Sequence, residues 1–144
     1  MKKLKRGIVE VYYGESPYFL YPAIGLVARA VGHEMPCCFI QFKRNEISEW
    51  ISELGFLDTH FFDITSVSAL SQAVKTANHS LVSKSYDIVV LDSILDLVNE
   101  KILPSQQLEE IIKNRPFDVE LVLTGARLPK PIYTLADLIT LVRK

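Results

Sequence analysis

Apolar runs alternate along the chain with segments whose apolar residues recur at helical spacing. The apolar runs predict strands over 7–13, 37–42, 60–64, 86–92, 119–124 and 138–142. The intervening patterns predict helices over 22–31, 47–54, 66–82, 94–101 and 105–114. Strands that alternate with helices imply right-handed crossovers. The fold class is therefore expected to be α/β, a three-layer α/β/α arrangement with a mostly parallel sheet, in a single domain over 1–144.

Some positions carry more specific expectations. The unbroken run Ile88-Val89-Val90-Leu91 is typical of a central strand that is buried on both faces. Ser66 or Ser68 is expected to cap the third helix. The second helix is expected to end at Gly55, and its apolar stripe would consist of Ile47, Trp50, Ile51 and Leu54.

The composition argues against nucleic acid and membranes as partners. The chain has 144 residues and a net charge of −1, so it has no overall attraction for nucleic acid or anionic lipid. It contains no apolar run of the roughly 18 residues that a membrane span needs. Cys37 and Cys38 are neighbours on one predicted strand and point to opposite faces, so they are poorly placed to pair. We therefore expect a cytoplasmic protein with reduced thiols, which binds neither nucleic acid nor membrane.

The segment between the first strand and the first helix lies where a nucleotide-binding α/β protein holds phosphate. Ligands of such sheets bind beyond the carboxyl ends of the strands, and phosphate is held there by N–H groups of a glycine-rich turn and a helix N-terminus. Residues 14–23 read Gly-Glu-Ser-Pro-Tyr-Phe-Leu-Tyr-Pro-Ala, with one glycine, no lysine and two prolines. The position is that of a phosphate site, but the composition argues against ordinary nucleotide chemistry.

The aromatic residues around this turn allow three interpretations. They fill a vacated pocket and extend the core, they form an interface with a partner protein, or they hold a flat apolar ligand by stacking. We expect filling or an interface rather than a small-molecule site. The residues concerned are Tyr13, Tyr18, Phe19 and Tyr21.

Short motifs follow one another in a recognisable order over nearly the whole chain. They are Val11-Tyr12-Tyr13-Gly14, Arg29-Ala30-Val31-Gly32-His33-Glu34-Met35, Gln41-Phe42-Lys43, Tyr86-Asp87-Ile88-Val89-Val90-Leu91-Asp92, Lys113-Asn114-Arg115-Pro116, Val122-Leu123-Thr124-Gly125 and Ala136-Asp137-Leu138-Ile139-Thr140. In order and spacing they resemble the P-loop ATP:corrinoid adenosyltransferases. Members of that family attach the adenosyl group of ATP to a reduced corrinoid cobalt, and the resemblance implies a P-loop-NTPase-like fold.

The departures from the family pattern fall on its functional positions. The family's loop reads Gly-x-Gly-Lys-Gly-Lys-Thr-Thr, whereas residues 14–21 here lack both lysines and both threonines. Ser16 and Tyr18 replace the inner glycines, so the backbone is expected to wrap less closely around phosphate. Ser93 follows Asp92 where the family has an acid, which weakens a magnesium site. The phosphate loop is thus expected to be degenerate.

Two functions remain open at this stage. The first is a non-catalytic or ATP-binding-impaired homologue, homodimeric by resemblance, which acts as a binding or assembly protein and uses the aromatic loop for a protein partner. The alternative is an active ATP:cob(I)alamin adenosyltransferase with an atypical phosphate site for ATP, magnesium and a corrinoid. The candidate cofactor-binding residues are Gly14, Ser16, Asp92, Thr124, Gly125 and Arg127, with Asp92 as the candidate metal ligand.

Each of these candidates also has a purely structural interpretation. Asp92 could cap the segment that follows it, and we favour this role over metal binding. A tight turn after a strand explains Gly125 as well as ligand binding does. The spacing of the sequence identifies no catalytic residue.

Overall fold

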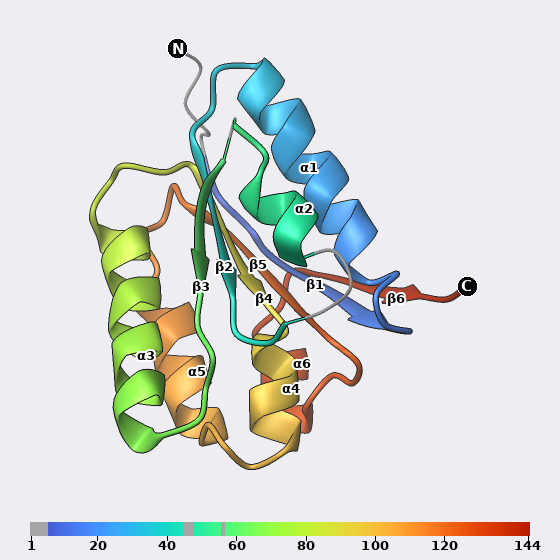
Figure 1. Cartoon of the computed structure of the whole chain (residues 1–144), viewed down its shortest axis with the longest axis vertical. Helices are drawn as coiled ribbons and strands as arrows, with labels where there is room; N and C mark the ends of the chain where they lie inside the picture. The colour runs from blue at the N-terminus through green and yellow to red at the C-terminus, as the bar shows by residue number, and fades with distance from the viewer. Residues whose placement is uncertain (1–5, 45–47, 56) are drawn as a thin grey trace.

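The computed structural model describes residues 6–44, 48–55 and 57–144. Within them six strands form one parallel sheet in the order β3-β2-β4-β5-β1-β6 (Figure 1). The strands are β1 (Val9–Gly14), β2 (Cys37–Gln41), β3 (Asp58–Phe61), β4 (Ile88–Asp92), β5 (Glu120–Gly125) and β6 (Leu138–Val142).

Helices cover both faces of this sheet. They are α1 (Leu20–Gly32), α2 (Ser48–Ser52), α3 (Val67–Val82), α4 (Ile94–Asn99), α5 (Ser105–Lys113) and α6 (Lys130–Tyr133). Figure 1 shows α1 and α2 over one face, α3 and α5 over the other, and α4 and α6 near the carboxyl ends of the strands. The predicted three-layer, P-loop-NTPase-like fold with a parallel sheet is confirmed.

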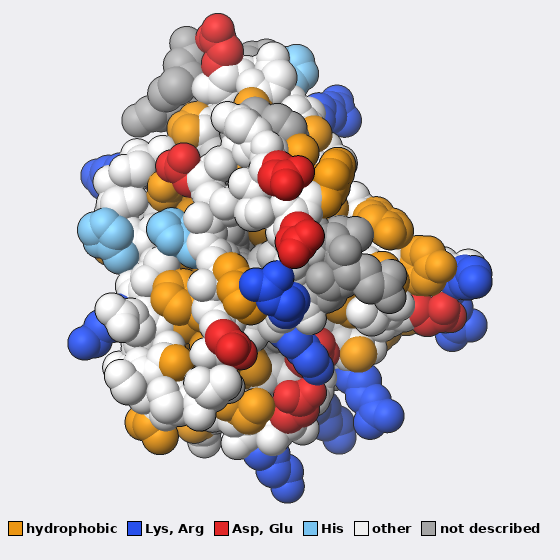
Figure 2. Space-filling view, in the orientation of Figure 1, with side chains coloured by type: hydrophobic (Ala, Val, Ile, Leu, Met, Phe, Trp, Pro, Cys, Tyr) orange, Lys and Arg blue, Asp and Glu red, His pale blue; other side chains and the backbone are white. Residues whose placement is uncertain are grey.

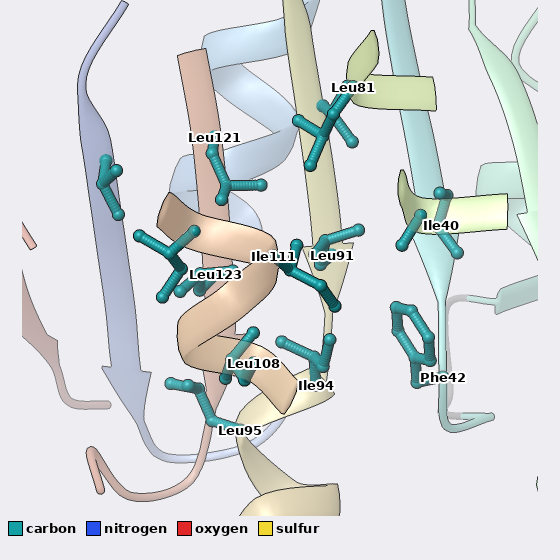
Figure 3. Packing of buried hydrophobic residues seen from close by; sticks show 14 of the residues in the cluster. Ile40, Phe42, Leu81, Leu91, Ile94, Leu95, Leu108, Ile111, Leu121 and Leu123 are labelled. Carbon is teal, nitrogen blue, oxygen red and sulfur yellow. The ribbon is translucent and has the colours of Figure 1, made fainter. Parts of the chain in front are cut away.

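Alternate residues of the strands divide the core into two clusters. Val89 and Leu91 of β4 pack with the helices α3 and α5, while Ile88 and Val90 pack with α1. Figure 3 shows the first cluster, in which side chains from β4, β5 and α5 face one another. All five residues of β4 are buried, so the prediction of a central strand covered on both faces is confirmed.

The two cysteines follow the same alternation. Cys38 belongs to the α3–α5 cluster and Cys37 to the α1 cluster, and both thiols are free. Burial raises the pKa of each thiol to about 12. They are small core residues on opposite faces, as their adjacency predicts.

Local signals placed most element ends to within two residues of the observed ones, and the exception is the short, polar third strand. Ser66 caps α3 by accepting the Ala69 N–H at 3.1 Å, as expected. The third strand was expected over 60–64 but occupies Asp58–Phe61. It pairs only with β2 in the described part of the sheet, and Asp58 accepts the Tyr86 hydroxyl at 2.6 Å. The extent of β3 therefore follows from its pairing with β2.

The apolar stripe expected on the second helix is only partly present. Ile51 is fully buried, but Trp50 is 50% exposed, so its assignment to the stripe was wrong. The helix ends at Ser52 rather than at Gly55, and Ile47 lies outside the described residues. A stripe over five helical residues is too short to enforce burial of every apolar member.

Arg115 ties together the amino end of the sheet. Its Nη1 atom donates to the carbonyl oxygens of Gly7 at 3.1 Å and Val119 at 2.6 Å. Through these bonds the segment after α5 links the residues that precede β1 to the residues that precede β5. Among the described residues, no helix is both long and apolar enough to cross a bilayer.

Candidate functional site

The carboxyl ends of β1, β2, β4 and β5 meet around a cavity of about 380 Å³. Its walls come from the turn after β1, the residues after β2, one side of α4 with the residues that flank this helix, and the residues after β5. Of the sequence-predicted site residues, Ser16 and Arg127 line it, together with Phe19 from the aromatic loop. The parallel topology thus brings together the sheet edge that the sequence singled out.

The turn after β1 uses its backbone N–H groups within the protein. The Glu15 N–H donates to the Val142 carbonyl, and the N–H groups of Phe19, Leu20 and Tyr21 donate to carbonyls three or four residues earlier in the same turn. These bonds measure 2.9–3.2 Å. Pro17 has no N–H group. A phosphate-binding turn directs such groups at the ligand, and here four of them point at carbonyl oxygens instead.

Gly14 is required by the neighbouring strand. Its φ is +139°, and a Cβ atom there would lie 2.1 Å from the carbonyl oxygen of Val142 in β6. Such a contact is sterically impossible, so only glycine permits β1 and β6 to approach here. This glycine therefore has a structural explanation that requires no phosphate.

The aromatic residues of the loop occupy different environments. Phe19 is 2% exposed and packs into the α1 cluster, whereas Tyr21 is 47% exposed. The Tyr18 and Tyr21 rings meet edge to face, with centroids 5.9 Å apart. Tyr13 packs against the cluster on the opposite face of the sheet. Phe19 thus fills the core, as the first of the three interpretations expects for it, whereas Tyr21 and its edge-to-face partner Tyr18 form the outer pair of the loop.

Asp92 is the last residue of β4 and is fully buried, and it is Ser93, the next residue, that lines the cavity. Its Oδ1 accepts the Thr124 hydroxyl at 2.7 Å, and its Oδ2 accepts the Gln41 amide at 2.9 Å. The Ser93 hydroxyl lies 3.3 Å from Oδ1, and the Thr124 oxygen accepts the Ser93 N–H at 2.8 Å. Burial raises the pKa of Asp92 to about 6, and these hydrogen bonds oppose part of that rise.

The sequence suggested two roles for Asp92, helix capping and metal binding, and the geometry supports neither. The expected capping role was wrong, because Ser93 occupies the N-cap position of α4, with φ +65°. A magnesium ion also fits poorly, because it keeps several waters and needs open octahedral space. Asp92 is 0% exposed, and its carboxylate already accepts hydrogen bonds from Thr124 and Gln41. The described residues contain no group of three or more His, Cys, Asp or Glu side chains that could hold a metal.

Gly125 allows α4 to pack onto the end of β5. A Cβ atom there would lie 2.5 Å from the Leu95 Cβ and 3.1 Å from the Asp96 Oδ1. The same Asp96 oxygen accepts the Ala126 N–H at 2.8 Å. Gly125 thus has a structural explanation in the close packing of α4 against the end of β5.

The structure adds two cations to the cavity that sequence reasoning did not assign to the site. Lys43 and Arg44 follow β2 and line the cavity with Arg127. The Lys43 Nζ lies 2.9 Å from the Glu100 Oε1, and this bond raises the lysine pKa. The Arg44 guanidinium lies 4.4 Å from the centre of the Phe61 ring. The motif Gln41-Phe42-Lys43, which ends a predicted strand, was the available signal for this pair.

Charges of both signs therefore surround the cavity. Asp96 of α4 and Glu100, which follows α4, also line the cavity, and their carboxylates lie 4.0 and 2.9 Å from the Lys43 Nζ. Figure 2 shows basic and acidic side chains next to one another over the lower half of the face in view. This arrangement gives a weaker field for a polyphosphate than a cluster of cations alone would give.

Comparison with known proteins identifies relatives over the whole fold. The chain is 26% identical over 152 residues to the corrinoid adenosyltransferase of Escherichia coli, which covers 96% of this chain and 78% of the relative. The corrinoid adenosyltransferase CobA of Salmonella typhimurium matches with the same identity and coverage. The sequence model described as ATP:corrinoid adenosyltransferase BtuR/CobO/CobP matches residues 5–144. The chain therefore belongs to the ATP:corrinoid adenosyltransferase family.

Proposed function

We propose that this chain is a family member that no longer holds the phosphates of ATP in the turn after β1, and that it acts as a binding or assembly protein rather than as an enzyme. The observation that carries the proposal is the internal use of the N–H groups of Glu15, Phe19, Leu20 and Tyr21. To bind phosphate these groups would first have to leave their present acceptors. The turn also supplies no lysine to compensate for that loss.

The packing of the turn supports the same proposal. Phe19 anchors it in the α1 cluster, and the Glu15 N–H anchors it to the end of β6. A preorganised phosphate site is effective because its donors need no rearrangement when the charged ligand arrives. Rearranging this turn would expose a buried phenylalanine and break its contact with β6. Binding of ATP in the family's manner is therefore expected to be very weak.

One observation favours the alternative of an active transferase with altered contacts. Lys43, Arg44 and Arg127 bring three cations to one cavity at the correct edge of the sheet. In that reading Arg127 contacts phosphate with help from the hydroxyl groups of Ser16 and Ser93. Lys43 is already bonded to Glu100 and Arg44 already lies on Phe61. We therefore rank this function second.

Calorimetry with ATP, with and without magnesium, separates the two functions, with the Escherichia coli corrinoid adenosyltransferase as the positive control. We expect no saturable heat with ATP, which corresponds to a dissociation constant weaker than about 1 mM. A titration with a corrinoid in the same buffer then asks whether binding of the second substrate of the family is retained.

Turnover provides the deciding measurement. Magnesium-dependent transfer of adenosyl from ATP to cob(I)alamin by the pure protein would overturn the proposal. Saturable ATP binding that weakens in both Arg127→Ala and Lys43→Ala would establish the altered contacts instead. The variant Lys75→Ala serves as the control, because Lys75 lies on α3, away from this cavity.

The outer pair Tyr18 and Tyr21 is the surface that we propose for a protein partner. Tyr21 is 47% exposed and its ring contacts that of the partly exposed Tyr18, and tyrosine is enriched in interfaces. We also propose a cytoplasmic location, which suits two free thiols that the core keeps protonated and apart.

A further inference from the structure

A smaller cavity lies at the amino end of the sheet, opposite the candidate functional site. It is enclosed by the last turn of α1, the residues after this helix and the first residues of β4 and β5. Figure 1 shows α1 beginning near the tip of β1 and ending at the opposite end of the sheet. The volume is about 200 Å³, and no residue that the structure describes lines both this cavity and the one at the carboxyl ends.

The polar groups of this smaller cavity lie at its two ends. Glu120 is 9% exposed and belongs to the inner wall. Arg29 and His33 are exposed and form the mouth. The rest of the lining is apolar and consists of Leu26, Ala30, Met35 and Ile88. A carboxyl group thus lies inside the cavity, and N–H donors lie at its opening.

Glu120 is one member of a buried carboxyl pair that receives no donor from the surrounding protein. Its side chain is hydrogen-bonded to that of Glu10 in β1, which is 7% exposed. Among the described residues, no backbone N–H or hydroxyl group donates to either carboxyl, and the Glu10 Oε2 is buried. Arg115 acts on Glu120 through its charge, but its Nη1 donates to backbone carbonyl oxygens. The pair therefore has more acceptors than donors.

Asp92 shows how this protein satisfies another buried carboxyl group with its own donors. It accepts the Thr124 hydroxyl and the Gln41 amide, at 2.7 and 2.9 Å. A buried polar group without such partners is rare and needs an explanation. At Glu10 and Glu120 the adjoining cavity supplies one, because a ligand there can bring donors from outside the protein.

The chemistry of the two ends of the cavity indicates a zwitterion. An ammonium group carries three N–H donors and a positive charge, which suit the acceptors of the carboxyl pair. The Arg29 guanidinium suits a carboxylate, with which such a group forms paired hydrogen bonds. The apolar wall between them suits a short hydrocarbon chain. The cavity is smaller than the about 300–1,000 Å³ that is usual for drug-sized ligands, so the molecule is small.

A ligand with only one charged end fits this cavity less well. A simple carboxylate would leave the carboxyl pair without a donor, or would bring a second negative charge next to it. A simple amine would meet the positive charge of Arg29 at the mouth, and among the described residues Arg29 forms no ion pair that would cancel it. Both ends are satisfied together only by a molecule that carries both groups.

We propose that this cavity binds a small zwitterion, with its ammonium group on Glu120 and Glu10, its short apolar chain along the wall and its carboxylate on Arg29. The ω-amino acids are the class of compound with this order of groups. The proposal does not depend on whether the chain binds ATP, because the two cavities share no described residue.

Calorimetry of the purified full chain with γ-aminobutyrate, δ-aminovalerate and ε-aminocaproate tests the proposal. We expect saturable binding of at least one of them. Pentylamine and valerate have the chain of δ-aminovalerate but lack one charged end each. Each should bind at least about tenfold more weakly than the best of the three zwitterions, the effect of roughly 1.4 kcal/mol. Equally tight binding of either compound overturns the proposal. So does the absence of saturable heat with all three zwitterions, which would mean that the carboxyl pair is served by water alone.

Substitutions at the two ends test the orientation of the ligand. Glu120→Gln should weaken binding of the zwitterion at least about tenfold, whereas Glu110→Gln on the exposed face of α5 should not. Arg29→Gln should weaken the zwitterion but not pentylamine, a difference that a merely structural role of Arg29 would not produce. Arg143→Gln is the matched control, because Arg143 is exposed after β6. Unchanged zwitterion binding in Glu120→Gln or Arg29→Gln overturns the proposal.

Filling the cavity tests the location without removing a charge. Met35 lines the apolar wall, and the larger side chain of Met35→Trp would occupy the space of the ligand. We expect this variant to lose binding of every zwitterion while circular dichroism shows the wild-type fold. Zwitterion binding that persists in the folded Met35→Trp protein would place the ligand elsewhere and overturn the proposal.

Discussion

At the scale of single residues, the role of each loop side chain depends on whether it faces the core or the solvent. Phe19 and Tyr21 are two positions apart in the sequence, yet one is 2% exposed and the other 47%. Phe19 packs with residues of α1, β2 and β4, which form the cluster on one face of the sheet. It therefore links the turn after β1 to the stability of the cluster that α1 covers.

Replacing Phe19 by alanine should cost about 3 kcal/mol of unfolding free energy, because the substitution leaves a cavity in a packed cluster. Urea titration followed by circular dichroism measures the change. Tyr21→Ala is the matched control and should cost less than about 1 kcal/mol, because its ring is half exposed. Equal losses in the two variants would show that the turn does not anchor the cluster.

At the scale of elements, α4 and β5 pack so closely at Gly125 that there is no room for a Cβ atom. Gly125 meets the Leu95 Cβ and the Asp96 backbone, and the neighbouring Ala126 N–H is bonded to the Asp96 side chain. The start of α4 also supplies Ser93, whose N–H binds Thr124 of β5. These bonds fix the floor of the cavity. Hence any ligand there depends on the seating of a six-residue helix.

Gly125→Ala is expected to lower the unfolding free energy by about 1–3 kcal/mol, since its Cβ would force α4 away from β5. Gly25→Ala is the opposite control. Gly25 lies within α1, and a Cβ there meets nothing within 4 Å. Alanine should stabilise the helix by up to about 1 kcal/mol. Thermal unfolding of both variants decides, and a stable Gly125→Ala protein would contradict the packing argument.

At the scale of the whole molecule, the sheet buries two carboxyl groups on the face that α1 covers. Glu10 of β1 and Glu120 of β5 are 7% and 9% exposed and are hydrogen-bonded to each other. Burial, followed by the neighbouring Glu10 charge, raises the pKa of Glu120 to about 7, and burial raises the pKa of Glu10. Tyr12 and Arg115 also interact with Glu120. This pair favours the folded state while it is protonated.

Stability should therefore fall as the pH rises. An unfolded glutamate loses its proton near its ordinary pKa of 4.5, whereas the folded Glu120 keeps its proton until about pH 7. Between these values the folded state binds more protons, so the unfolding free energy decreases with rising pH. We expect a loss of about 1–2 kcal/mol across this window from the pair, after allowing for solvent access.

Urea titrations at pH 5 and pH 8 measure this loss. Glu120→Gln should reduce the pH dependence without removing it, because glutamine does not titrate whereas Asp92, whose pKa burial raises to about 6, still does. Glu110→Gln is the control on the exposed face of α5 and should keep the wild-type slope. Stability that increases from pH 5 to pH 8, or an unchanged slope in Glu120→Gln, would show that the pair is ionised in the folded protein.

The sequence by itself determined the order of the elements, the parallel sheet and the edge at which a ligand would bind. The reason is that period-2 and helical apolar patterns are local and strong, and strands separated by helices leave few topologies. The motif order also identified the family before any contact was known. The unusual composition of residues 14–21 is likewise a property of the sequence alone.

Only the tertiary structure decided what the individual residues at that edge do. Gly14 allows a close approach to Val142, which lies far away in the sequence. Gly125 allows a close approach to Leu95, which lies on another element. Lys43 and Arg44 reach the cavity because β2 ends beside β4 in space. The bonds of Asp92 to Gln41 and Thr124 likewise arise from strand order. Such roles depend on which strands become neighbours in the sheet, and a local sequence pattern does not encode which strands these are.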